Sequence, residues 1–307
     1  MANLKELAKK GELLSGGHRA CAGCTFPTII RQALAATDTP VVVGAATGCM
    51  SVATTIFPFS AWRVPFIHSA FENVAATISG VEAAYRSLKK QGKLDKEIRF
   101  IAFGGDGGTY DIGLQSLSGA MERGHRMLYI CYNNEAYMNT GIQRSSATPL
   151  GAETTTSPVG KASYGKKQRS KDLTAIMVAH NIPYCAQASP SHWNDFVTKV
   201  QKALNTDGPT FINVLSPCRL GWAFPPEKAI QIARDAVNSC YWPLYEVENG
   251  KYRLTYKPKE KLPITEFLKE QTKFRHLMKP ENQWIIEEIQ KEVDTQWERL
   301  LKMAESE

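Results

Sequence analysis

Between about residue 40 and residue 216, short β-rich runs alternate with stretches of helical periodicity. The β-rich runs are largely apolar, which is typical of strands buried on both faces of a parallel sheet. They cover residues 41–46, 98–103, 127–132, 182–188 and 210–215. Helical periodicity covers residues 70–91, 111–123 and 191–204, and Gly92 and Gly124 stand where the first two helices should end. The alternation predicts an α/β fold, a parallel sheet flanked by helices, in which ligands bind at the carboxyl ends of the strands.

The chain changes character after Pro225 and Pro226. A helix follows, then a hairpin whose turn is Asn249-Gly250, and then charged helices from Ile264 and from Glu281 onward. We expect these helices to be too polar to form a core of their own. The pattern therefore predicts a main domain, residues 1–225, and a C-terminal extension, residues 226–307, that packs as an arm on a neighbouring chain.

Charge and hydropathy exclude several classes of protein. The longest apolar runs are far shorter than the ~20 residues that span a bilayer, and the first residues contain no apolar signal segment, so we expect a soluble cytoplasmic protein without a membrane association. The formal charge of +7 has no nucleic-acid recognition motif beside it. Its densest cluster lies in a long loop, residues 145–171, and is either a solvated basic surface or a docking surface for an acidic partner. The cluster consists of Lys161, Lys166, Lys167, Arg169 and Lys171.

A glycine-rich turn with a carboxylate in its middle follows the second predicted strand. It reads Gly104-Gly105-Asp106-Gly107-Gly108 and leads into the helix over residues 111–123. Glycines let a backbone approach phosphate closely, and the helix directs its amide end at an anion. Asp106 is then placed to hold the hard divalent cation that a bound diphosphate requires. Taken alone, the same segment is also compatible with a simple turn.

The next predicted strand ends in Asn133-Asn134. Because neighbouring parallel strands end at the same edge of the sheet, these amide oxygens should lie beside Asp106. Amide and carboxylate oxygens suit Mg²⁺. The two segments together indicate a diphosphate and magnesium site more strongly than either does alone.

Four of the seven cysteines form a candidate metal centre. Cys21 and Cys24 have the two-residue gap that lets both sulfurs reach one centre, while Cys49 and Cys218 each follow a predicted strand end. Four thiolates suit zinc or an iron–sulfur cluster equally well by count, and for Cys21 and Cys24 a redox dithiol is an alternative. A zinc ion at this edge would have no chemistry to do beside the diphosphate, whereas a cluster would accept electrons. The other three, Cys131, Cys185 and Cys240, lie in or beside apolar stretches and should be small buried side chains.

The Gly-Asp-Gly and Asn-Asn pairing resembles the motif of the thiamine-diphosphate enzymes. This resemblance implies that Mg²⁺ is held by Asp106, the side chain of Asn134 and the backbone carbonyl of Ala136. It also places a wider set of residues around thiamine diphosphate, the candidates being Thr47, Gly48, Cys49, Met50, His68, Gly105, Asp106, Gly107, Gly108, Met138 and Asn139. His68 has an alternative role as the cap of the helix that follows it. The fold expected on this basis is a thiamine-diphosphate-binding fold.

With the cysteines included, the sequence closely resembles the beta subunit of pyruvate:ferredoxin oxidoreductase, in the family of 2-oxoacid:ferredoxin oxidoreductases. The similarity runs from about residue 17 to about residue 256 and rests on residues 17–24, 71–73, 104–124 and 137–141. In that family Cys21, Cys24, Cys49 and Cys218 would bind a [4Fe-4S] cluster, so residues 1–225 would form the thiamine diphosphate and cluster domain. The resemblance implies oxidative decarboxylation of a small 2-oxoacid, with electrons passed through the cluster to ferredoxin.

The sequence departs from the pyruvate pattern beside these motifs. Thr25 replaces a glycine, Met50-Ser51 replaces a Leu-Glu pair, and Phe66 replaces a tryptophan. The substrate is therefore pyruvate by resemblance, with coenzyme A as a co-substrate in that case, or oxalate or another short 2-oxoacid. Asn139 and Thr140 are the candidate catalytic residues, since they follow the metal-binding turn.

Two other kinds of protein remain to be separated from this reading. A thiamine-dependent decarboxylase or synthase without electron transfer would leave the four cysteines without a role, and a cluster-binding scaffold without activity would leave Asp106 and Asn134 without one.

Thiamine activation also needs a glutamate from a pyrimidine-binding domain, for which Glu72 is the internal candidate. The compact part of the chain has no room for that domain, so we expect subunits of alpha, gamma and delta type to complete the enzyme.

Overall fold

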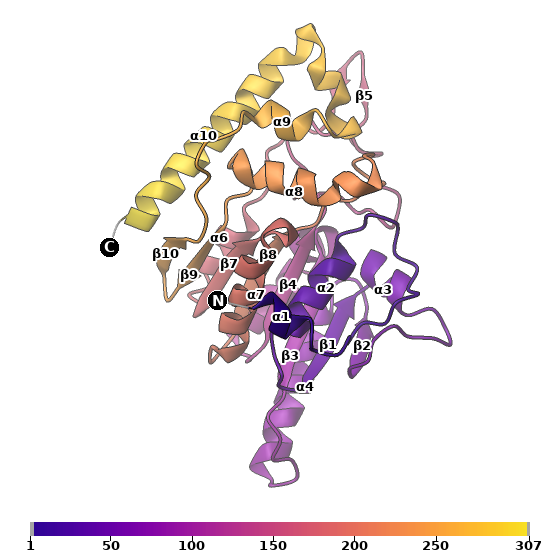
Figure 1. Ribbon diagram of the computed structural model, residues 1–307, viewed down its shortest axis with the longest axis vertical. Helices are drawn as coiled ribbons and strands as arrows, with labels where there is room; N and C mark the ends of the chain where they lie inside the picture. The colour runs from indigo at the N-terminus through magenta and orange to yellow at the C-terminus, as the bar shows by residue number, and fades with distance from the viewer. Residues whose placement is uncertain (1–2, 306–307) are drawn as a thin grey trace.

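The structure, a computed structural model, describes residues 3–305 and is built on one eight-stranded sheet (Figure 1). The strand order is β10-β9-β7-β8-β4-β3-β1-β2. From β2 to β7 all neighbouring strands are parallel, and β9 and β10 continue the sheet in antiparallel pairing. The bounds are β1 Val41–Ala46, β2 Phe66–Ser69, β3 Arg99–Gly105, β4 Leu128–Asn133, β7 Tyr184–Ala188, β8 Thr210–Leu215, β9 Tyr245–Glu248 and β10 Lys251–Leu254.

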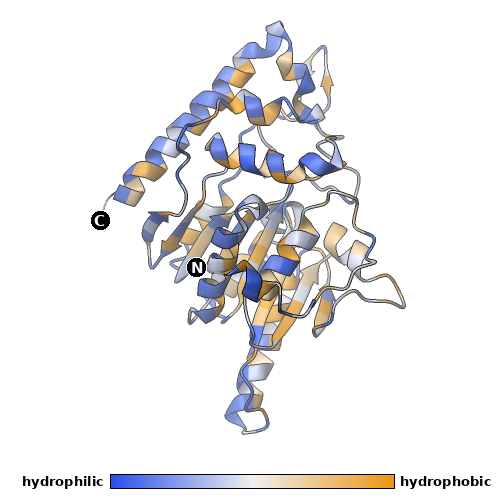
Figure 2. Cartoon of the chain, viewed as in Figure 1, coloured by the Kyte–Doolittle hydropathy of each residue, from blue (hydrophilic) through white to orange (hydrophobic). Residues whose placement is uncertain are grey.

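The predicted strands are confirmed, with small shifts at their ends. Strands β4 and β8 are buried at every position, because helices cover both faces of the sheet. In Figure 2 these central strands are mostly coloured as apolar. Sequence reasoning missed β2, an edge strand that is only partly buried and pairs with β1 alone.

Helices pack on each face of the sheet and enclose two cores. One core joins the sheet to α2 (Phe26–Ala35) and α7 (Trp193–Asn205), and the other joins it to α4 (Val74–Lys90), α5 (Leu114–Glu122) and α6 (Leu173–Val178). The helices predicted over residues 70–91, 111–123 and 191–204 correspond to α4, α5 and α7. A π-helical turn, η1 (Gly107–Asp111), precedes α5, so this helix begins later than predicted. Gly92 and Gly124 follow α4 and α5 with φ of 69° and 70°, as helix-ending glycines do.

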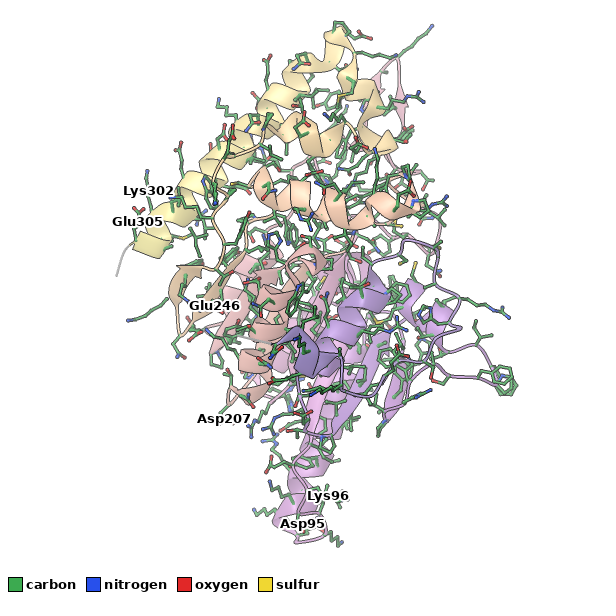
Figure 3. The ribbon with its side chains drawn as sticks, viewed as in Figure 1. Asp95, Lys96, Asp207, Glu246, Lys302 and Glu305 are labelled. Atoms are coloured by element: carbon green, nitrogen blue, oxygen red, sulfur yellow. The ribbon has the colours of Figure 1, made fainter. Side chains whose placement is uncertain are left out.

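The remaining helices are short, apart from two in the C-terminal part. They are α1 (Leu4–Leu7), α3 (Cys49–Thr54), α8 (Ala229–Asn238), α9 (Ile264–Leu268) and α10 (Gln283–Glu305). The 3₁₀ helices are η2 (Pro190–His192), η3 (Pro226–Lys228), η4 (Thr272–Met278) and η5 (Pro280–Asn282). In Figure 3, Asp95 and Lys96 mark the turn beyond α4, at the opposite end of the molecule from α9. None of the helices within residues 3–305 combines the length and the apolar character needed to cross a membrane.

The C-terminal segment buries more apolar surface than its sequence suggested. The hairpin turn at Asn249-Gly250 is confirmed, but strand β9 pairs with β7, so the hairpin extends the main sheet. A third core lies between α8, α9, α10 and the segment after β8. Its buried side chains include Trp222, Ile232, Phe267, Leu277, Ile285, Ile286, Ile289 and Val293. An apolar stripe on one face of each helix supplies most of these side chains. The core is not independent, however, because Ala152, Leu215, Trp222 and Phe224 of residues 1–225 complete it. A contact of residues 226–307 with partner subunits stays a prediction.

The long loop over residues 145–171 is largely anchored to the rest of the chain. It contains a small hairpin of β5 (Val159–Gly160) and β6 (Ser163–Tyr164). Lys166, predicted within a surface cluster of basic residues, is only 2% exposed and donates to the carbonyl oxygen of Thr148. Burial lowers the pKa of Lys166 to about 8. The surface part of this basic cluster is thus smaller than the sequence indicated.

Ile285 offers a test of how α10 contributes to stability. Its side chain is fully buried beside Gly151 of the long loop. We expect Ile285→Ala to reduce the free energy of unfolding by about 2–5 kcal/mol, since it leaves a cavity in the third core. Urea unfolding of the purified chain, followed by tryptophan fluorescence, measures this loss. Ile230→Ala on α8, where the side chain is 36% exposed, is the matched control and should change stability little; equal losses would contradict the packing of α10 described above.

Candidate functional site

A cleft lies where the parallel strands β1, β3 and β4 end. Its wall is formed by the segments that follow these strands and by the turn before α4. The lining residues are Thr47, Gly48, Cys49, Phe71, Gly105, Asp106, Gly107, Gly108, Tyr132, Asn134, Ala136, Tyr137, Met138, Asn139 and Thr140. The carboxyl edge of a parallel sheet is the common ligand position in α/β folds.

Most residues predicted from the sequence meet in this cleft. Thr47, Gly48, Cys49, Gly105, Asp106, Gly107, Gly108, Asn134, Ala136, Met138, Asn139 and Thr140 all line it. Met50 does not, because its side chain is fully buried in the core between the sheet and α2. Its contribution is to pack α3 against the sheet, which holds the neighbouring Cys49 in place.

His68 lies beside the cleft, near its rim. It belongs to β2, is exposed, and its Nε2 is hydrogen-bonded to Thr47 Oγ1 at 2.9 Å. The alternative role as a helix cap is wrong, since α4 begins at Val74 with Asn73 at the cap position. A contact between His68 and a cofactor stays a prediction.

Three aromatic or apolar wall residues were missed. Phe71, Tyr132 and Tyr137 line the cleft, and the rings of Phe71 and Tyr137 pack with centroids 5.6 Å apart. Phe71 and Tyr137 stand in the two short segments that carried the family resemblance, which was a usable signal. Tyr132 is the penultimate residue of a buried strand, where nothing in the sequence distinguishes a wall residue from a core residue.

The glycines after β3 are required by close packing. A Cβ on Gly107 would lie 2.5 Å from Cδ1 of Tyr137, and one on Gly108 would lie 3.0 Å from the carbonyl oxygen of Phe71. The first distance is too short for a side chain, and the second would fit one only if the backbone at Phe71 moved. The floor of the cleft is therefore bare backbone, the surface that a phosphate group can approach closely.

Asp106 is completely buried at the base of the cleft. Its Oδ1 accepts a hydrogen bond from the backbone N–H of Asn134 at 3.1 Å, and its Oδ2 accepts one from Ser145 Oγ at 2.5 Å. Burial nevertheless raises the pKa of Asp106 to about 7, because these two donors compensate only part of the lost hydration. A cation bound to Asp106 would offset the remaining free-energy cost of burying the carboxylate.

One terminal atom of the Asn134 side-chain amide faces two further oxygens. It lies 2.8 Å from the carbonyl oxygen of Ala136 and 2.9 Å from Oδ1 of Asp106. With the amide rotated, its NH₂ group would donate to both. With the oxygen in this position, a carboxylate, an amide and a backbone carbonyl converge, which is the donor set that Mg²⁺ prefers. The residues present therefore fit the magnesium ion that the thiamine enzymes require.

The four predicted cluster ligands come together beside this cleft. All of them are free thiols, at the segment before α2, at the start of α3 and after β8. Burial raises the pKa of Cys24 to about 12 and that of Cys49 to about 11, and in both cases the neighbouring thiols raise it further. Cys218 acts on both, so the group interacts as one unit.

Four thiolates are the donor set of a [4Fe-4S] cluster, so the chemistry of these side chains suits the predicted cluster. Among the residues that the structure describes, no three His, Cys, Asp or Glu side chains are grouped closely enough to hold one ion. The binding of a cluster stays a prediction. Cys131, Cys185 and Cys240 are buried in apolar cores, which confirms the structural role predicted for them.

The thiol group and the cleft share a wall. Cys49 lines the cleft and is hydrogen-bonded by the side chain of Asn139. Met138 packs on Gly221, whose backbone N–H donates to Cys218 Sγ at 3.3 Å. A group held by these cysteines would therefore lie next to a group held in the cleft.

Comparisons with known proteins agree with this geometry. Residues 43–214 match the family described as "Thiamine pyrophosphate enzyme, C-terminal TPP binding domain". The chain is 53% identical to pyruvate synthase subunit PorB of Thermotoga maritima, over 99% of this chain and 97% of that protein. It is 55% identical to PorB of Methanocaldococcus jannaschii, over 92% and 94%, and 46% identical to ketoisovalerate oxidoreductase subunit VorB of Pyrococcus abyssi, over 94% and 92%.

A solved structure shares the fold at much lower sequence identity. It is a 2-oxoglutarate:ferredoxin oxidoreductase from Magnetococcus marinus, with a TM-score of 0.57 and 18% identity, over 72% of this chain and 79% of that one. The fold and the site thus define a thiamine-pyrophosphate-binding domain. Within that class, the chain belongs to the family of beta subunits of the 2-oxoacid:ferredoxin oxidoreductases, which are multi-subunit enzymes.

Proposed function

We propose that this chain binds thiamine diphosphate with Mg²⁺ in the cleft and a [4Fe-4S] cluster on Cys21, Cys24, Cys49 and Cys218. In this proposal the complete enzyme decarboxylates pyruvate oxidatively, with coenzyme A as acceptor of the acyl group, and passes the electrons to ferredoxin. The observation that carries the proposal is the convergence of the Asp106 carboxylate, the Asn134 side-chain amide and the Ala136 carbonyl group in a cleft whose wall includes Cys49.

Some residues of the chain bind the charged groups of the cofactors, and others orient the substrate. Thiamine diphosphate supplies the carbanion chemistry that cleaves the bond between the ketone and the carboxylate. Asp106 and Asn134 bind the metal ion, and the bare backbone at Gly107 and Gly108 takes the diphosphate. Cys49, in the cleft wall, keeps the cluster beside the reacting group, so electrons need travel only a short distance.

Asn139 and Thr140 are the proposed substrate-contacting residues. Both line the cleft, and the hydroxyl group of Thr140 donates to Gln143 Oε1 at 2.5 Å. That bond orients the Thr140 side chain and leaves its oxygen available as an acceptor. The contact of the Asn139 side chain with Cys49 supports a role for Asn139 beside the thiol group.

Pyruvate is the proposed substrate because pyruvate synthase subunits match nearly the whole chain. The ketoisovalerate oxidoreductase subunit is 46% identical, as is the PorB subunit of Pyrococcus furiosus, so identity at this level does not separate substrates. Steady-state rates of the complete enzyme with pyruvate, oxalate, 2-oxoglutarate and 2-oxoisovalerate test the choice. We also expect the enzyme to work in the cytoplasm, since its seven cysteines are all free.

A partner subunit is expected to cover the cleft. Glu72, the internal candidate for the thiamine-activating acid, is not among the lining residues. Large apolar side chains are exposed on the segments next to the cleft, namely Val52, Phe57, Phe59, Ile112 and Leu220. Exposed apolar groups of this kind mark protein–protein contacts. We propose that the subunit bound there brings the missing glutamate.

The metal assignment predicts the effect of Asp106→Ala. Loss of the buried carboxylate should abolish Mg²⁺-dependent binding of thiamine diphosphate, measured by calorimetry on the assembled enzyme. The visible absorption of the cluster should remain, because the cysteines form a separate site. Asp95→Ala, at the turn beyond α4, is the control and should bind normally. Unchanged cofactor affinity in Asp106→Ala would remove the metal assignment.

The cluster assignment predicts different results for two cysteines in the same half of the chain. Cys218→Ser should lose or degrade the cluster, because the thiolate is a ligand, whereas Cys240→Ser should keep its iron. Iron and acid-labile sulfide per chain are the measurements. The same assay separates this proposal from a thiamine enzyme without electron transfer, which would contain no iron. Equal iron loss in both variants would show that the fourth ligand is wrong.

The shared-site proposal predicts that the chain is inactive by itself. Loaded with Mg²⁺, thiamine diphosphate and cluster, it still lacks the acid that must act on the aminopyrimidine ring. Reduction of methyl viologen by pyruvate should be absent with the chain alone and should start when the partner subunits are added. Substantial turnover by the chain alone would refute the shared site.

A further inference from the structure

The turn between β4 and the cleft is held from outside the cleft by the C-terminal third of the chain. Glu135 stands between Asn134 and Ala136, the two proposed ligands on this turn, and has a φ of 68°. Residues with a Cβ rarely adopt this conformation. It persists only where surrounding contacts determine it, which is common at functional sites.

Three side chains fix Glu135. The hydroxyl group of Tyr241 donates to Oε1 at 2.6 Å, and the ammonium group of Lys273 donates to Oε2. Thr148 Oγ1 donates to the backbone carbonyl oxygen of Glu135 at 2.6 Å. The side chain of Glu135 is buried, so each of these contacts is made away from water.

Lys273 is itself held by a second contact to the same turn. Its Nζ lies 3.8 Å from the centroid of the Trp222 ring, and Trp222 Nε1 donates to the carbonyl oxygen of Asn134 at 2.8 Å. The backbone of Thr272 donates to the carbonyl oxygen of Trp222 at 2.8 Å. These contacts link Asn134 to Trp222, Trp222 to Lys273, and Lys273 to Glu135, which follows Asn134 in the chain.

We propose that Lys273 is a positioning residue for the metal site: its ammonium group holds Glu135 and so fixes the side-chain amide of Asn134 and the carbonyl group of Ala136 beside Asp106. Lys273 and Glu135 do not line the cofactor cleft, so they act through the turn. Without the ammonium group, the Glu135 carboxylate would be a second unpaired buried anion near Asp106. The inference rests on the proposed magnesium and thiamine diphosphate site.

The test uses Mn²⁺ in place of Mg²⁺ in the assembled enzyme, with thiamine diphosphate present and the iron oxidised. Electron paramagnetic resonance gives the Mn²⁺ affinity and a line shape that reports the symmetry of the ligand set. The variants are Lys273→Met and the double variant Lys273→Met with Glu135→Gln, which removes both charges. Lys228→Met is the control, because Lys228 forms an exposed ion pair with Glu270 in the same part of the chain.

We expect Lys273→Met to weaken Mn²⁺ binding by about tenfold or more, the usual effect of losing a group that orients a metal ligand, and to broaden the spectrum. The double variant should regain the melting temperature but keep the weak binding and the altered spectrum, which a purely stabilising role would not produce. Wild-type Mn²⁺ affinity and line shape in either variant would overturn the proposal. If Lys273→Met does not assemble with its partner subunits, the Mn²⁺ affinity and line shape of the double variant decide the question. Absence of Mn²⁺ binding in the wild-type enzyme would instead refute the proposed function.

Discussion

The buried carboxylate of Asp106 is the charge on which the arrangement of the site depends. It is completely inaccessible to water, and the hydrogen bonds from Asn134 and Ser145 leave its pKa raised to about 7. A buried anion is costly unless donors or cations surround it. The donors come from the turn after β4 and from the long loop that follows this turn. Both segments are therefore positioned by hydrogen bonds to the same carboxylate.

The C-terminal segment supports that arrangement from behind. Trp222, Tyr241 and Lys273 all reach the turn that contains Asn134 and Glu135. They can do so because β9 continues the sheet beside β7 and because the third core fixes η4 and α10 on the same side. Residues 226–307 thus pack against the edge of the sheet at which the cleft lies.

The sequence predicted the parts of the fold that depend on local pattern. Strands β4 and β8 are apolar runs because both faces are covered, and the end of α4 at Gly92 follows from backbone conformation. It did not predict β2, because this edge strand is only partly buried and lacks a clear apolar pattern. It also did not predict the burial of Lys166, because a charged side chain is expected at the surface and its acceptor, the carbonyl oxygen of Thr148, cannot be foreseen from the sequence. Asp106 and Asn134 could be assigned to one site because adjacent parallel strands end together. Met50 could not be separated from Cys49, since adjacent residues of a short helix point in different directions, here into the core and into the cleft wall.

Ionisable groups gather at one edge of this sheet, where burial disfavours their negatively charged forms. The thiols of Cys24 and Cys49 have raised pKa values because of burial and of one another, and a diphosphate beside them would add further repulsion. Backbone N–H groups provide part of the compensation, as at Gly221 and Cys218. Lys273 provides a buried cation: burial lowers its pKa, and Glu135, Cys218 and Asp106 oppose that effect. One ammonium group therefore interacts with both Cys218 of the thiol group and the buried carboxylate of Asp106. In the proposed function two anionic groups would stand on either side of the wall between the cleft and the thiols, and Lys273, buried behind the turn, is a cation whose charge acts on both sides of that wall.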